Sequence, residues 1–190
     1  MRKNSTLRPL CECAVFTALA LALSYVKIPT GVAFGGFGGS IDLVMIPLIL
    51  CAVRWGTIWG LGSGLVFGTL KFFFAGGSAI SWESMLLDYS LAYMMVGLAG
   101  VLKGRDRMAW LAALIGCIGR FAIHFISGVT IYAEYVSPIL GWNGKSSIIY
   151  SILYNGSYML PEMLITLVVG VAVTSVLDLR SESIKPLRKK

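Results

Sequence analysis

The chain has 190 residues, of which 57% are hydrophobic and only 13% are charged, and its formal net charge at pH 7 is +7. A soluble domain carries roughly a quarter charged residues, so this composition excludes an ordinary soluble protein and predicts an integral membrane protein. No cluster of basic residues has aromatic residues between its members, so we expect a lipid bilayer, and no nucleic acid, around this chain.

Apolar segments predict an all-α fold with six transmembrane helices in a single domain over residues 1–190. The expected helices cover residues 10–26, 41–53, 57–74, 84–102, 108–132 and 146–177, and polar tails cover residues 1–9 and 178–190. The second segment is short for a span, so we expect it to be tilted, kinked or continuous with its flanks. Lys71 lies near the end of the third helix, and we expect its amine to extend to the membrane surface.

Small residues recur every four positions on two of these helices. On the first helix they are Ala14, Ala18 and Ala22, and on the third they are Gly56, Gly60, Gly64 and Gly68. Small residues let helices approach closely in lipid, so the glycines predict tight packing against a neighbouring helix. The alanines are compatible with packing inside the chain or with a docking surface for another protein.

The segment between the first two helices, residues 27–40, contains Pro29, five glycines, Phe34 and Phe37. Glycine and proline interrupt helices, so this segment is predicted to be a flexible loop. It either closes over a pocket, with Phe37 as a contact, or serves only as a connector.

Four cysteines, Cys11, Cys13, Cys51 and Cys117, all lie in apolar segments. We expect buried structural thiols, because free cysteine behaves as a small hydrophobic residue. Their spacing fits neither a zinc site nor a redox pair, so no metal or cofactor is predicted.

Lysine and arginine residues are distributed unequally between the two ends of the predicted bundle. Lys27 and Lys145 lie at one end. Twelve lie at the other end, namely Arg2, Lys3, Arg8, Arg54, Lys103, Arg105, Arg107, Arg180, Lys185, Arg188, Lys189 and Lys190. Cytoplasmic segments of membrane proteins are enriched in these residues, so both termini are predicted to be cytoplasmic.

Polar residues from several helices gather in the outer half of the predicted bundle. They are Asp42, Asp88, Tyr89, His124, Tyr150 and Asn155. His124 belongs to a stripe on the fifth helix with a spacing of four, whose other members are Arg120, which lies deeper, Gly128 and Tyr132. Polar groups within a span usually face a cavity or a partner, so we expect a ligand pocket that is open to the outside. Arg120 is expected either to pair with Glu162 or to close the floor of this pocket.

The residue types in this set indicate the class of ligand. Asp42 and Asp88 favour a cation or an amine, the aromatic side chains provide stacking and cation–π contacts, and His124 and Asn155 add directional hydrogen bonds. A small, positively charged heteroaromatic molecule would satisfy all three features.

Three other interpretations of these residues remain open. His124 alone is compatible with a hydrogen bond between two helices. Asp88, His124 and Glu162 could form the relay of an autonomous cation- or proton-coupled transporter. A membrane enzyme is disfavoured, because the sequence has no Walker loop, no metal cluster and a single histidine.

The motifs of this chain resemble those of thiamine-specific S components of energy-coupling factor transporters. The resemblance rests on Asp88-Tyr89, on Arg-x-x-x-His-x-x-x-Gly-x-x-x-Tyr from Arg120, on Tyr-x-x-x-x-Asn-Gly from Tyr150 and on Ile-Asp-x-x-x-Ile-Pro from Ile41. The chain departs from the family pattern at Asp88, where glutamate is frequent, and at Tyr132, where tryptophan is frequent.

The resemblance implies a non-enzymatic, substrate-binding subunit in a bacterial plasma membrane. Such a subunit captures thiamine outside the cell and associates with a transmembrane coupling subunit and two cytoplasmic ATPase subunits. The implied contacts to thiamine are Asp88, Tyr89, Arg120, His124, Gly128, Tyr132, Tyr150 and Asn155, with Phe37 in the loop, and Ala14, Ala18 and Ala22 would face the coupling subunit. An S component for another vitamin is the alternative within this class.

Overall fold

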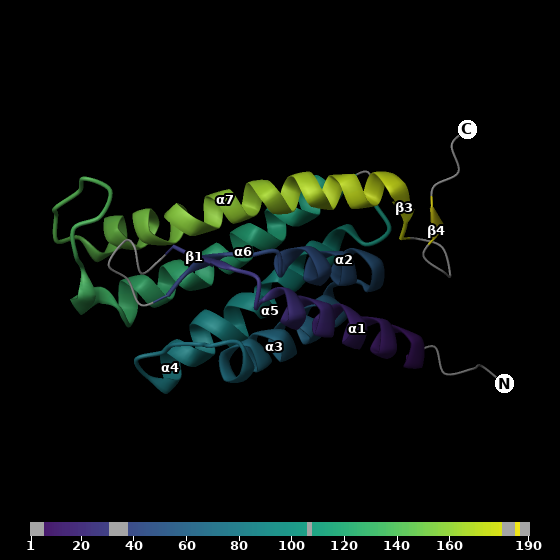
Figure 1. Cartoon of the computed structure of the whole chain (residues 1–190), viewed down its shortest axis with the longest axis horizontal. Helices are drawn as coiled ribbons and strands as arrows, with labels where there is room; N and C mark the ends of the chain where they lie inside the picture. Colours follow the sequence, from purple (N-terminus) through teal and green to yellow (C-terminus); the bar gives the residue numbers. More distant parts are fainter. Residues whose placement is uncertain (1–5, 31–37, 106–107, 180–184, 187–190) are drawn as a thin grey trace.

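The computed structural model describes residues 6–30, 38–105, 108–179 and 185–186. Within these ranges the chain forms a bundle of helices. The first and last described residues lie at the same end of this bundle (Figure 1). The helical segments are α1 (Leu7–Leu23), α2 (Met45–Trp55), α3 (Thr57–Phe74), a composite helix over Trp82–Leu102, α6 (Ala109–Thr130) and α7 (Ser147–Val176). The predicted all-α fold is therefore confirmed, and the predicted helix bounds agree to within a few residues.

Four of these helices are long and apolar enough to cross a membrane. They are α3, the composite helix, α6 and α7. By contrast, α1 has 17 residues and α2 has 11, fewer than the roughly 20 that a straight span needs. Most of α2 is buried, so this short helix packs inside the bundle rather than against lipid.

The composite helix changes its winding three times between Trp82 and Leu102. It begins as α4 (Trp82–Met85), continues as a π-helical turn η2 (Leu86–Leu91) and α5 (Ala92–Val96), and ends as a 3₁₀ segment η3 (Gly97–Leu102). Its start is fixed by Ser81, whose hydroxyl accepts a hydrogen bond from the Ser84 amide in a capping box. π-Helical turns are rare and frequently mark functional sites.

One short antiparallel pair of strands lies between α1 and α2, and a second follows α7. Strand β1 (Ile28–Pro29) pairs with β2 (Ser40–Ile41), and β3 (Leu177–Asp178) pairs with β4 (Lys185–Pro186). Within the predicted loop 27–40, the described residues next to α1 and α2 are therefore tied together. Between α6 and α7 a single 3₁₀ turn, η5 (Ala133–Tyr135), is the one helical element described.

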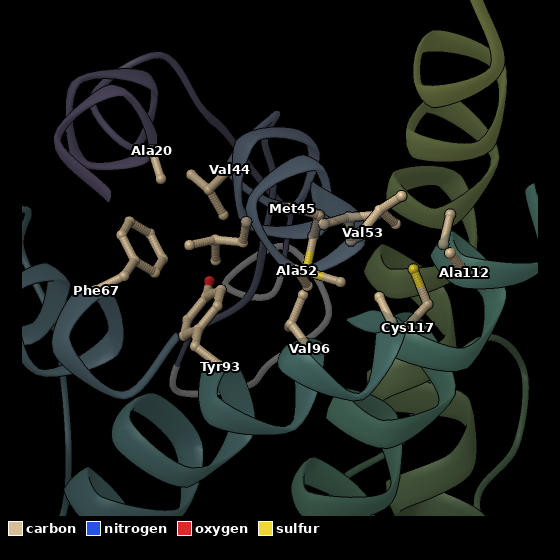
Figure 2. Packing of buried hydrophobic residues seen from close by; sticks show 14 of the residues in the cluster. Ala20, Val44, Met45, Ala52, Val53, Phe67, Tyr93, Val96, Ala112 and Cys117 are labelled. Carbon is tan, nitrogen blue, oxygen red and sulfur yellow. The ribbon is translucent and has the colours of Figure 1, made fainter. Parts of the chain in front are cut away.

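The hydrophobic core lies where α1, α2, α3, the composite helix and α6 meet. Figure 2 shows side chains from these helices converging, with the Phe67 ring beside Tyr93. The two ring centroids are 4.8 Å apart in an edge-to-face arrangement. This packing places Tyr93 and its hydroxyl at the centre of the bundle.

The glycines of α3 pack directly against the backbone of the composite helix. A Cβ atom at Gly60 would lie 2.9 Å from Gly97 Cα, and one at Gly64 would lie 3.0 Å from Met94 Cα. Real side chains do not fit at these distances, so the predicted tight packing of the glycine face is confirmed.

Polar residues close the end of the bundle where the termini lie. Arg54 is buried and forms an ion pair with Glu12 of α1. Its Nη1 donates a hydrogen bond of 2.7 Å to the Leu179 carbonyl. Trp55 Nε1 donates to the same carboxylate at 3.1 Å. We call Glu12, Arg54, Trp55 and Leu179 the terminal-end cluster.

Three of the four cysteines are buried, as predicted, but Cys11 is exposed. Residues two apart on a helix point to different faces, so the face of α1 that buries Cys13 turns Cys11 outward. The prediction of a buried thiol is wrong at Cys11.

Candidate functional site

A cavity of about 280 Å³ lies at the end of the bundle opposite the termini. Its wall includes the β1–β2 pair, the loop after α3, the π-helical turn η2, α6 and α7. Eight predicted site residues line it, namely Asp88, Tyr89, Arg120, His124, Gly128, Tyr132, Tyr150 and Asn155. The ninth, Phe37, lies outside the described residues. The structure thus brings the predicted set together around one space, and contact with a ligand remains a prediction.

Asp88, in the π-helical turn, is bonded to two groups of α6. Its Oδ1 lies 3.1 Å from His124 Nδ1, and its Oδ2 accepts a hydrogen bond of 3.0 Å from the Ser127 hydroxyl. An ionised carboxylate only accepts hydrogen bonds, so Nδ1 carries the imidazole proton. In neutral His124 the other ring nitrogen, Nε2, is then an acceptor, and it is buried with no partner in the described part of the chain.

Tyrosines form most of the aromatic surface of the cavity. Tyr150, Tyr154 and Tyr158 follow one another at four-residue spacing on α7, with the first two rings stacked at 5.8 Å and an interplanar angle of 11°. Tyr132 and Tyr135 form a second pair, 6.2 Å apart, across the mouth. Sequence reasoning missed Tyr154 and Tyr158, although their spacing from Tyr150 was the signal that could have found them.

Two of these tyrosines also hold the loops that border the cavity. The Tyr89 hydroxyl accepts from the Ser78 amide at 2.8 Å and donates to the Ser78 carbonyl at 3.2 Å. The Tyr154 hydroxyl has the same pair of contacts with the backbone of Gly38. Each hydroxyl thus fixes one loop to the helices that carry the predicted site.

Gly128 and Asn155 position α6 against α7. A Cβ atom at Gly128 would lie 2.9 Å from Ser151 Cβ, so only glycine permits this approach. Asn155 Nδ2 donates to the Ser151 carbonyl at 3.0 Å and to the His124 carbonyl at 3.3 Å, and its Oδ1 accepts from the Tyr158 hydroxyl at 2.7 Å. Both residues therefore shape the cavity through packing between helices.

The inner end of the cavity is closed by a buried chain of charged groups, the cavity-floor cluster. It contains Asp42, Lys71, Tyr93, Arg120 and Glu162, of which Lys71, Tyr93 and Arg120 line the cavity. Arg120 Nη1 lies 2.7 Å from Glu162 Oε1, and Lys71 Nζ lies 2.7 Å from Asp42 Oδ2. The Tyr93 hydroxyl accepts from both cations, at 2.6 Å from Lys71 and 3.1 Å from Arg120.

The contacts of the cavity-floor cluster contradict two predictions and bear on a third, the role of Arg120. Lys71 is buried and does not extend to the membrane surface, because Asp42 and Tyr93 hold its amine inside the bundle. Asp42 is likewise engaged by Lys71 and is absent from the described cavity wall, so its expected role in attracting a cationic ligand directly is wrong. Arg120 pairs with Glu162 and also lines the floor, so both expectations for it hold together.

The charges of the cavity-floor cluster and Asp88, taken together, do not cancel. With every carboxylate ionised and His124 neutral, Glu162 balances Arg120 and Asp42 balances Lys71. Asp88 is left with neutral hydrogen-bond donors in the described contacts. Lys27 also lines the cavity, but it is exposed and donates to the Ala75 carbonyl, so water screens its charge. The half-buried carboxylate of Asp88 therefore favours a ligand that carries one positive charge.

The alanine stripe of α1 lies on the outside of the bundle. Ala14, Ala18 and Ala22 are all exposed, whereas Cys13 and Ala20 face the interior. Packing within the described chain therefore does not account for the stripe, and docking of a partner remains a prediction. The described residues also contain no group of three or more histidine, cysteine, aspartate or glutamate residues that could hold a metal.

Comparison with known proteins identifies the family. The profile of the thiamine transporter protein family (Thia_YuaJ) matches residues 10–179. The chain is 30% identical to thiamine transporter ThiT of Bacillus subtilis strain 168, over 89% of this chain and 91% of that protein. It is 28% identical to ThiT of Lacticaseibacillus paracasei, over 92% of this chain and 90% of that protein.

Solved structures give the same result. The structure of ThiT from Listeria monocytogenes superposes with a TM-score of 0.76 at 27% identity and covers 90% of this chain and 95% of that one. The family consists of transport proteins, and the helices of this chain are those of a multi-pass protein of the bacterial membrane. The chain belongs to the thiamine transporter family.

Proposed function

We propose that this chain is the thiamine-binding membrane subunit, or S component, of an energy-coupling factor importer, and that it captures thiamine with high affinity from the extracellular side. The observation that carries the proposal is the environment of Asp88. Its half-buried carboxylate has only neutral hydrogen-bond donors in the described contacts when His124 is neutral, and tyrosines line the same cavity. Thiamine combines a cationic thiazolium ring with a neutral aminopyrimidine ring, so it supplies both the missing charge and the flat faces.

The residues around the cavity have complementary roles in this proposal. Asp88 accepts a hydrogen bond from the aminopyrimidine and balances the charge of the ligand. His124 offers Nε2 as an acceptor for a second N–H group, since that atom has no partner in the described contacts. Tyr132 and Tyr150 provide aromatic faces for stacking and for cation–π attraction. Arg120 bounds the ligand from below.

The size of the cavity supports a ligand of this class. Its volume of about 280 Å³ is near the lower end of the range for small-molecule sites, roughly 300–1,000 Å³. That space suits a molecule with two small rings, and it is restrictive for a much larger vitamin. We therefore favour thiamine over the alternative of another vitamin.

Calorimetric titration of the purified chain in detergent tests the proposal. We expect saturable binding of one thiamine with a dissociation constant below the micromolar range. Riboflavin and biotin, titrated in the same way, should release no heat of binding. Absence of binding at micromolar thiamine, or equal binding of the other vitamins, would contradict the proposal.

Coupling to partner subunits is the second part of the proposal. The exposed alanine stripe supports docking of a transmembrane coupling subunit, because small residues let a partner helix approach closely. The sequence contains no ATP-binding loop, so the two ATPase subunits would supply the energy. Replacing Ala14, Ala18 and Ala22 with leucine should preserve thiamine binding and abolish ATP-dependent uptake in reconstituted vesicles. Uptake by the chain alone would instead favour an autonomous cation-coupled transporter.

A further inference from the structure

We propose that Glu162 and Asp42 determine the charge specificity of the site, although neither belongs to the described cavity wall. Each holds and neutralises a cation that lines the cavity, Arg120 or Lys71, so the charge of Asp88 dominates at the ligand. This inference deepens the proposed function and rests on it. It assigns specificity to two residues that reach the site only through the cations they hold.

Burial of the four side chains is the first step in the argument. Side-chain exposure is 5% for Arg120, 2% for Glu162, 8% for Lys71 and 0% for Asp42. Water and salt screen such charges weakly, so their effect extends across the cavity. A charge at this depth therefore acts on the ligand even when it does not contact it.

The balance of charge is the second step. Lys71 and Arg120 without their carboxylates would give the cavity two positive charges against the single negative charge of Asp88. With the carboxylates, the two floor pairs and Asp88 sum to −1. Lys27 also lines the cavity, but it is exposed, so water and salt screen its charge more than those of the buried pairs. Removing either carboxylate brings the sum to zero and removes the preference for a cation. Loss of the carboxylate from either pair should therefore weaken the binding of a cationic ligand.

Tyr93 is the third step, because it connects the two pairs. Its hydroxyl accepts a hydrogen bond from each cation, and its ring lies 4.4 Å from the Arg120 guanidinium and 5.0 Å from Lys71 Nζ. The ring is buried in the core against Phe67, as Figure 2 shows. Tyr93 thus keeps both cations at fixed positions on the floor, and a bound cation meets them only as neutralised pairs.

The test compares thiamine with its neutral isostere, in which a thiophene ring replaces the thiazolium ring. Both ligands are titrated into the purified wild-type chain and into Glu162→Gln and Asp42→Asn. A unit charge roughly 10 Å from a bound cation, at an effective dielectric constant of about 20, changes its binding by about tenfold to twentyfold. Each variant should lose about that factor for thiamine and change less than about threefold for the isostere.

Two charge-balanced double variants are the matched controls, Arg120→Gln with Glu162→Gln and Lys71→Gln with Asp42→Asn. Each removes a whole pair, so the sum stays at −1 and the ratio of the two affinities should stay near the wild-type ratio. Whole buried pairs are also removed with less loss of stability than single partners, so these variants remain informative if a single variant fails to fold.

Each outcome is decisive. A selective loss for thiamine in the single variants, with the ratio retained in the doubles, supports the inference. Equal losses for both ligands mean that the pairs only stabilise the fold, and a ratio that falls in the doubles excludes charge balance as the cause. If the wild-type chain binds thiamine but does not prefer it to the isostere, the inference fails while the proposed function stands. If the wild-type chain does not bind thiamine, the proposed function itself fails.

Discussion

Two clusters of charged residues, one at the end of the bundle where the termini lie and one beneath the cavity, differ in how completely their polar atoms are used. In the terminal-end cluster, Arg54 is bonded to Glu12 and to the Leu179 carbonyl, and Trp55 donates to the same carboxylate. In the cavity-floor cluster, Arg120 Nε and Glu162 Oε2 are buried without a partner in the described part of the chain. His124 Nε2, in the wall of the same cavity, is also buried without a hydrogen-bond partner in the described part of the chain.

This difference separates a structural role from a binding role. Buried polar atoms in proteins are nearly always hydrogen-bonded, so each exception needs an explanation. The polar atoms of the terminal-end cluster form hydrogen bonds between α1, α2 and the residues that follow α7. Such bonds hold these segments together, which is a structural role. The cavity-floor cluster has unused hydrogen-bonding capacity next to an open space, which is what a site for a ligand or ordered water requires.

The largest expected effect follows from changing the charge of the cavity itself. Asp88→Asn removes the unbalanced charge and weakens a charge-assisted hydrogen bond, so thiamine affinity should fall by about 100-fold or more. Calorimetric titration measures the loss. Glu134→Gln is the matched control, because Glu134 is exposed in η5 and is not part of the described cavity wall. Normal binding by Asp88→Asn would show that the cavity has been assigned wrongly.

The second effect concerns the approach of α6 and α7 beside the cavity. Gly128→Ala would place a methyl group against Ser151, and overpacking of this kind costs about 1–3 kcal/mol. Both the thermal midpoint and thiamine affinity should decrease. Gly170→Ala on α7 is the control, since a Cβ atom there meets no atom within 4 Å. Equal effects of the two substitutions would contradict a role specific to the cavity.

The third effect concerns the terminal-end cluster, where a substitution should lower the stability of the protein and leave thiamine affinity unchanged. Glu12→Gln leaves the buried Arg54 with weaker partners, and we expect the free energy of unfolding to fall by about 1–2 kcal/mol, because the carboxylate is partly exposed. Thermal melting in detergent measures this loss, and thiamine affinity, measured on the folded protein, should not change. A fall in affinity would remove the distinction between the two clusters.

The smallest effect concerns the loop held by Tyr154. Tyr154→Phe keeps the aromatic surface but removes the hydroxyl that bonds to Gly38, worth about 1 kcal/mol, so thiamine should dissociate about threefold to fivefold faster. Stopped-flow displacement measures the rate. Tyr25→Phe is the control, because the Tyr25 hydroxyl also bonds to a backbone carbonyl, that of Phe74, outside the described cavity wall. An unchanged rate in Tyr154→Phe would mean that this hydrogen bond does not limit release.

Local signals in the sequence predict most of the fold and much of the site. Apolar length locates the helices, and the four-residue spacing of Arg120, His124 and Gly128 places these residues on one face of α6. Tyr132 continues the spacing two residues beyond the end of this helix. The same spacing at Tyr150, Tyr154 and Tyr158 would have extended the site along α7. These features depend only on residues within one helix, which is why they can be read without the structure.

Features that depend on distant residues could not be read in this way. Lys71 and Asp42 are 29 positions apart, and nothing local indicates that one neutralises the other inside the bundle. The rule for a lysine near the end of a span therefore gave the wrong position for its amine. The π-helical turn around Asp88 is equally hidden, because it depends on how the composite helix packs against α3 and α6.

The tyrosine-lined cavity has a consequence for optical measurements on this protein. The five tryptophans of the chain are Trp55, Trp59, Trp82, Trp110 and Trp142, and none belongs to the described wall of the cavity. Tryptophan emission therefore does not report directly on contact with a ligand in the cavity, whereas such contact perturbs tyrosine absorbance. Tyr132→Trp would place a fluorescent indole in the wall of the cavity, and quenching of its emission would report whether the cavity holds a ligand.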